Sequence, residues 1–66
     1  MDRYLLIKIN QFEEVSGIKL FKNFNEGKRY CIENFGYFND LGFVYENDKY
    51  FLIVLNEKKL NFSVNN

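Results

Sequence analysis

The sequence lacks the residues that most small proteins use to reinforce a limited core. It has no histidine and one cysteine, Cys31. A single thiol excludes an internal disulfide, and a chain without histidine and with one cysteine has no zinc-binding set. An unpaired cysteine is typical of a reducing compartment, so we expect a cytoplasmic protein. The four glycines are too scattered for a phosphate-binding loop, and we expect neither a metal nor a cofactor.

Long apolar runs and surplus charge are also absent. The first ten residues, MDRYLLIKIN, contain an apolar run of only three residues before Lys8. That run is shorter than the core of a signal peptide or the ~20 residues of a membrane span. Nine basic and nine acidic side chains give a formal net charge of zero. Because phosphate recognition depends on surplus Lys and Arg, we expect a soluble protein with no membrane partner and no nucleic-acid partner.

Aromatic side chains are what the chain has instead. Eight Phe and five Tyr make up 20% of its 66 residues. Each ring buries ~150–250 Å², so aromatic packing is the expected source of stability in a single compact domain over residues 1–66. Oligomerisation is the other route to a larger core for a chain this short. More than half of the residues are Phe, Tyr, Ile, Asn or Lys, a bias typical of AT-rich bacteria and of their phages and mobile elements.

Alternating side chains predict strands near both ends of the chain. Residues 3–10 alternate in part, with Leu5, Ile7 and Ile9 on one face and Tyr4, Leu6 and Lys8 on the other. Residues 18–22 predict a second strand, which pairs with the first as a hairpin if residues 11–17 form a loop. A helical turn around residues 12–15 is the alternative. Near the C-terminus, a last strand is predicted by the alternation of Leu60, Phe62 and Val64 with polar residues.

The clearest helix is amphipathic and spans about residues 25–35. Asn25 is the expected N-cap, and Gly36 is the expected end of the helix in the left-handed conformation. An apolar stripe at spacings of three and four is formed by Phe24, Gly27, Cys31, Ile32 and Phe35. Gly27 costs roughly 1 kcal/mol of helix propensity relative to Ala. We interpret it as the point where the helix lies close to a sheet.

The stretch LGFVYENDKYFLIVL, residues 41–55, predicts a β-hairpin with a turn at Asn47-Asp48, because Asn tolerates a positive φ. Counting outward from this turn pairs Tyr45 with Tyr50. One face then carries Val44, Phe51, Ile53 and Leu55. We assign this mostly aliphatic face to the helix. The opposite face carries Leu41, Phe43, Tyr45, Tyr50, Leu52 and Val54.

Together these segments predict an α+β fold: a small, mostly antiparallel sheet of four to five strands, in the order β-β-α-β-β-β, with one helix on one face. Because one helix covers one face, we expect the tyrosine-bearing face to be exposed and to bind a partner. The predicted partner-binding residues are Tyr4, Leu41, Phe43, Tyr45, Tyr50 and Leu52. The alternative is that the last strand and residues 11–17 cover this face and close a small barrel.

No catalytic constellation is evident. Glu13 and Glu14 are adjacent, so on a strand their side chains diverge to opposite faces, and the other acids near turns form no pair in an apolar pocket. Cys31 lies on the inward stripe of the helix, and no histidine is present to activate its thiol. We therefore expect a non-enzymatic protein-binding module.

In size and composition only, the chain resembles the small accessory and inhibitor proteins of phages and mobile elements, such as anti-CRISPR and other anti-defence proteins. Those proteins bind a host protein stoichiometrically. A homodimerising structural protein is the alternative. A further alternative is a single-stranded nucleic-acid binder that stacks bases on aromatic residues of the sheet.

Overall fold

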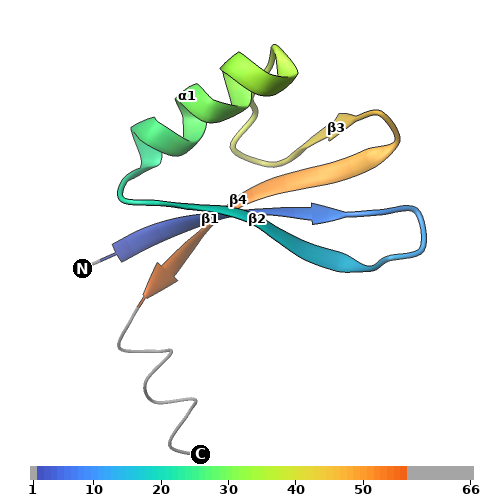
Figure 1. The fold of residues 1–66 in the computed structure, drawn as a ribbon, viewed down its shortest axis with the longest axis horizontal. Helices are drawn as coiled ribbons and strands as arrows, with labels where there is room; N and C mark the ends of the chain where they lie inside the picture. The colour runs from blue at the N-terminus through green and yellow to red at the C-terminus, as the bar shows by residue number, and fades with distance from the viewer. Residues whose placement is uncertain (1, 57–66) are drawn as a thin grey trace, which may run out of the picture.

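A computed structural model describes residues 2–56, which form one helix and four strands (Figure 1). The elements are β1 (Asp2–Ile9), β2 (Val15–Phe21), α1 (Phe24–Phe35), β3 (Phe43–Tyr45) and β4 (Asp48–Asn56). The strands form one open antiparallel sheet, and the helix lies on one side of it. This arrangement confirms the predicted α+β class. The predicted last strand around residues 60–64 lies outside the described residues.

β1 and β4, the first and last of the described strands, lie side by side in the centre of the sheet. The strand order is β2-β1-β4-β3, and every neighbouring pair is antiparallel. β1 and β4 pair along their whole length, from Asp2 opposite Asn56 to Ile9 opposite Lys49. The two hairpins are therefore joined edge to edge by strands that are far apart in the sequence, and α1 connects the two hairpins.

The loop between β1 and β2 is organised by the side chain of Asn10. Its Oδ1 accepts hydrogen bonds from the backbone N–H groups of Phe12 and Glu14, each at 2.9 Å. Its Nδ2 donates to the Glu14 carboxylate at 2.7 Å. β2 then begins at Val15, earlier than the predicted start, and includes a bulge at Ile18. The predicted hairpin is confirmed, and the alternative helical turn over residues 12–15 is wrong.

The N-cap of the helix lies two residues earlier than the sequence indicated. Asn23, not Asn25, is the N-cap: its backbone is extended, and its Oδ1 accepts a hydrogen bond from the Glu26 N–H at 2.9 Å. An Asn can bond the N–H three residues ahead only from just outside the helix, and Asn25 lies inside it. Gly36 ends the helix as predicted, with φ at 74° and its N–H donating to the Ile32 carbonyl at 2.9 Å.

The turn between β3 and β4 lies one residue earlier than predicted. Its two central residues are Glu46 and Asn47, with φ of 48° and 74°. Both values are positive, as a tight hairpin turn of type I′ requires. Asp48 therefore belongs to β4, where it pairs with Tyr45. The shift changes each cross-strand partner by two residues, so the same residues still share each face of the hairpin.

The helix covers the face that carries the tyrosines, so the predicted assignment of the two faces is wrong. The buried core consists of Leu6, Phe21, Cys31, Phe43 and Tyr50. Aromatic partners on both layers explain this choice. The Phe35 ring of α1 lies 5.6 Å from the Phe43 ring and 4.6 Å from the Tyr50 ring, centre to centre. The aliphatic set, Val44, Phe51, Ile53 and Leu55, has no such ring partners on the helix and faces the other way.

Gly27 is the point of closest approach between α1 and the sheet. A Cβ atom at this position would lie 2.8 and 2.9 Å from the two Cδ atoms of Leu52, and 3.3 Å from the Phe21 ring. These distances are shorter than van der Waals contact, so a side chain at this position would require Leu52 to shift. The interpretation of Gly27 as a close contact is confirmed.

Two glycines with positive φ allow a test of the packing around Phe51. Gly42 has φ of 105°, and a Cβ added there overlaps the Phe51 ring, whereas Gly36 has nothing within 4 Å. We expect Gly36→Ala to lower the free energy of unfolding by about 1 kcal/mol, because of the left-handed backbone alone. Gly42→Ala should lower it by about 3 kcal/mol, since the ring must also move. Urea unfolding measures both, and equal losses would contradict the Phe51 contact.

Candidate interaction surface

The face of the sheet opposite α1, called the outer face below, carries aliphatic side chains and one ring. The register of the three longer strands defines it: Leu5 lies between Leu20 and Ile53, and Ile7 lies opposite Phe51. Lys19, the neighbour of Leu20, points to the helix side, with its Nζ 5.2 Å from the centre of the Tyr30 ring. The apolar members of the outer face are Leu5, Ile7, Ile9, Val15, Leu20, Val44, Phe51, Ile53 and Leu55.

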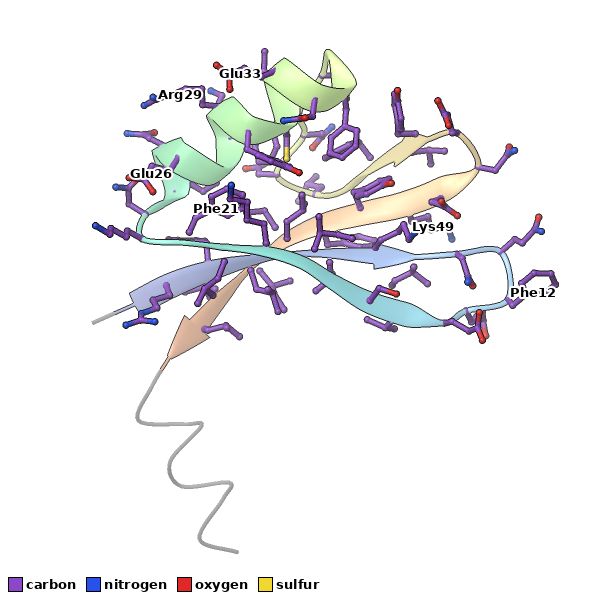
Figure 2. All side chains as sticks on the ribbon, viewed as in Figure 1. Phe12, Phe21, Glu26, Arg29, Glu33 and Lys49 are labelled. Atoms are coloured by element: carbon purple, nitrogen blue, oxygen red, sulfur yellow. The ribbon has the colours of Figure 1, made fainter. Side chains whose placement is uncertain are left out.

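Within residues 2–56 the outer face is partly open to solvent: four of its nine apolar side chains are exposed and the other five are half-buried. Val15 is 63% exposed and Val44 is 67% exposed, while Leu20 and Ile53 are also exposed. Figure 2 shows Phe21 between β2 and α1, while Glu26, Arg29 and Glu33 project from the far side of the helix. The helix therefore separates the core from solvent on one side only. A contiguous apolar surface of this kind marks an interaction site in soluble proteins.

Both ends of the outer face are hollowed and carry charge. At the end formed by the loop and the turn, a groove of about 500 Å³ is lined by Ile9, Val15 and Phe51, together with polar residues that include Glu13 and Lys49. At the opposite end a second groove, of about 480 Å³, is lined by Arg3, Leu20, Phe21 and Lys22. The middle of the face is aliphatic, and the charged side chains lie toward its ends.

The six residues predicted to bind a partner lie mainly under the helix. Phe43 and Tyr50 are buried, and their rings are stacked 5.4 Å apart. Tyr45 and Leu52 are half-buried against this core. Tyr4 packs its ring edge-on against Phe24, at 5.7 Å. Leu41 is separate from the others: it lies in the loop between α1 and β3 and is 85% exposed.

Sequence reasoning missed the outer face because both sets of hairpin residues are apolar. One signal favoured the correct choice. The apolar stripe of the helix carries Phe24 and Phe35, and large rings pack best against other rings, which only the tyrosine-bearing set provides. The aliphatic residues Ile7 and Ile53 then remain for the opposite face.

The described residues offer little for catalysis. Burial raises the pKa of the Cys31 thiol above its ordinary value, which disfavours the reactive thiolate. Among residues 2–56, no group of three or more His, Cys, Asp or Glu side chains is placed to hold a metal ion. In the same part of the chain, α1 is too short and too polar to cross a membrane.

Comparison with known proteins assigns no role to this surface. No protein-family model, no curated protein and no solved structure matches the chain. Function is therefore inferred from the geometry and chemistry of the described residues.

The assignment of the tyrosine-bearing face to the core predicts unequal effects of two Tyr→Ala substitutions. Tyr50→Ala should cost about 3–5 kcal/mol of the free energy of unfolding, because it leaves a cavity beneath α1. Tyr37→Ala removes the same side chain from a position that is 56% exposed, and we expect a cost of about 1 kcal/mol or less. Chemical denaturation measures both values. A smaller cost for Tyr50→Ala than for Tyr37→Ala would place the core on the other face.

Burial of Tyr50 also predicts a loss of stability at alkaline pH. Desolvation raises the pKa of its phenol above the ordinary value of 10, and the nearby carboxylates of Asp48 and Glu46 add to the rise. Above pH 10 the unfolded chain releases this proton while the folded chain retains it, so stability is full below pH 10 and falls as the pH increases further.

Melting temperatures between pH 8 and pH 11 test this linkage. Tyr50→Phe should lose less stability above pH 10 than the native chain, because the titrating group is gone. Tyr37→Phe, at an exposed position, serves as the control and should retain the alkaline loss. The same alkaline loss in Tyr50→Phe as in the native chain would show that another group is responsible.

Proposed function

We propose that this chain is a non-enzymatic protein-binding module whose contact surface is the outer face of the sheet. The observation that carries this proposal is an aliphatic face that spans β2, β1 and β4, with no described element packed on it. Exposure of such a face to water is unfavourable, and its burial against a partner releases about 25 cal/mol for each Å² of apolar surface. Binding is therefore the favourable outcome for this surface.

The size of the outer face suits a protein partner. Strands of this length, at ~3.3 Å per residue and ~4.8 Å between strands, form an area roughly 25 Å long and 15 Å wide. The protruding side chains make its accessible surface larger than this flat area. Stable protein–protein interfaces bury ~800 Å² on each partner. The flat area of the outer face is roughly half of that value, and its protruding side chains add to it.

The placement of the aromatic rings favours a protein over single-stranded nucleic acid. Base stacking needs exposed rings on a basic surface. Most rings of residues 2–56 pack between the sheet and α1, and within this range Phe51 is the one ring on the outer face. The charge at the ends of the face is mixed: one groove is lined by Glu13 and Lys49, and the other by Arg3 and Lys22. An apolar protein surface complements these features better than a phosphate backbone.

The size and composition of the chain support a role as an accessory or inhibitor protein of a phage or mobile element. In this role the module acts by stoichiometric binding to a host protein, such as a component of a CRISPR or other defence system. The amino-acid bias toward AT-rich codons supports such an origin. The paucity of reactive side chains supports an action by binding alone.

A matched pair of substitutions tests the contact surface. Leu20 and Ile32 are aliphatic residues with nearly equal exposure, 45% and 47%, but Leu20 lies on the outer face and Ile32 on the helix. For any protein partner identified from a bacterial lysate and then purified, or for the chain itself, Leu20→Lys should weaken binding about tenfold or more in calorimetry.

Ile32→Lys should leave this affinity within about twofold of the native value, since its side chain lies away from the outer face. Circular dichroism checks that both variants fold. A partner that binds Leu20→Lys as tightly as the native chain would refute the outer face as the contact surface. Failure of the native chain to bind any protein, including itself, would refute the module.

A further inference from the structure

We infer that the occupant of the outer face is a second copy of this chain, so that two sheets pack face to face in a homodimer. This inference rests on the proposed function, because it assumes that the outer face is a protein-binding surface. It names the partner from the chemistry of the face, from the small core and from the distribution of charge along the strands.

The chemistry of the outer face is that of a homodimer interface. Obligate and homodimeric interfaces resemble a domain core cut in half, whereas interfaces between proteins that also exist alone are about as polar as the rest of the surface. The centre of the outer face carries Leu5, Ile7 and Ile53 in adjacent strands, and no polar side chain stands between them. Such a surface matches another surface of the same kind.

The residues that dominate binding between unlike proteins are scarce on this face. Those residues are Trp, Tyr and Arg. The chain has no Trp, and four of its five tyrosines, Tyr4, Tyr30, Tyr45 and Tyr50, pack against the core on the helix side. The outer face is instead filled by Leu, Ile and Val, which favour packing between two sheets over recognition of a varied partner.

A second copy would also enlarge the small apolar core of the chain. A chain of this length buries only ~60% of the surface that its unfolded form exposes. In the described residues, the fully buried large side chains are Leu6 and Cys31. Packing of two outer faces would enclose a second apolar layer between two sheets ~10 Å apart. The dimer would then have four layers, with helices outside and sheets inside.

Charge along the strands selects one orientation of the two copies. The groove at the start of β1 is lined by Arg3 and Lys22. Four acidic residues lie at the loop-and-turn end, Glu13, Glu14, Glu46 and Asp48, and there Glu13 lines the groove together with the basic Lys49. A two-fold axis perpendicular to the strands places the basic end of one copy over the acidic end of the other, twice. A two-fold axis parallel to the strands would place like charges together, at an energetic cost. The net charge of zero adds no long-range repulsion between copies.

Sedimentation equilibrium of the full chain, from about 1 µM to about 500 µM, tests the homodimer. The native chain should sediment as a dimer at the upper concentrations. Leu20→Lys, on the edge strand, and Ile53→Lys, in the centre of the face, should each raise the dissociation constant about tenfold or more. Ile32→Lys should leave the dissociation constant within about twofold of the native value. Two outer-face variants keep the test valid if Ile53→Lys fails to fold.

Exchange of two charges tests the orientation. Lys22→Glu and Glu13→Lys should each weaken the dimer, and the chain with both substitutions should recover the native dissociation constant to within about threefold. Additive weakening in the double variant would overturn the arrangement with antiparallel strands. Added salt should weaken the native dimer, since these contacts lie at the rim.

Three results would overturn the inference. If the chain stays monomeric and Leu20→Lys lowers its melting temperature, residues 57–66 cover the outer face. This result refutes both the second copy and the proposed function. If the chain is monomeric and binds a host protein, and Leu20→Lys abolishes this binding, the proposed function stands and the second copy is refuted. If Ile32→Lys abolishes the dimer and both outer-face variants retain it, the dimer assembles through the helix, and the inference is refuted.

Discussion

The packing of the core of this small protein depends on the close contact between α1 and the centre of the sheet. At Gly27 the helix has no side chain, and Leu52 of β4 occupies the space where one would stand. This contact brings the helix down on the row that contains Leu6 and Leu52, with aromatic residues around it. A side chain at position 27 would force the Leu52 side chain to move out of this contact. The core of a chain with no disulfide depends on that approach.

The same contact accounts for the exposed surface. One helix covers one face, so the residues of alternate parity in β1 and β4, such as Ile7 and Ile53, point away from it. Their aliphatic character is ordinary for a core and unusual for a surface. We explain this by a second copy of the chain, which makes one continuous apolar layer from two open faces. Function in this account depends on what the helix leaves uncovered.

The sequence predicted the elements well and the faces poorly. Alternation, the glycine at Gly36 and the helical stripe located the strands and the helix within a few residues. The predicted N-cap was two residues too late because Asn23 and Asn25 have the same side chain. The predicted β3–β4 turn was one residue too late because Glu46 adopts a positive φ, which is more common for Gly or Asn. The wrong face of the hairpin was assigned to the helix because alternation along a strand separates the side chains into two sets without indicating which set contacts the helix. Only the match between rings across the two layers determines that choice.

The central claim is that the helix packs on the tyrosine-bearing face and that a second copy packs on the aliphatic face. Isotope-filtered NOE spectroscopy on a mixture of labelled and unlabelled full chain tests it directly. The account predicts intermolecular NOEs to the methyl groups of Leu5, Ile7 and Ile53. It predicts only intramolecular NOEs between the Tyr50 ring and α1. Intermolecular NOEs to the Tyr50 ring, with none to the methyl groups of Ile7 and Ile53, would contradict it.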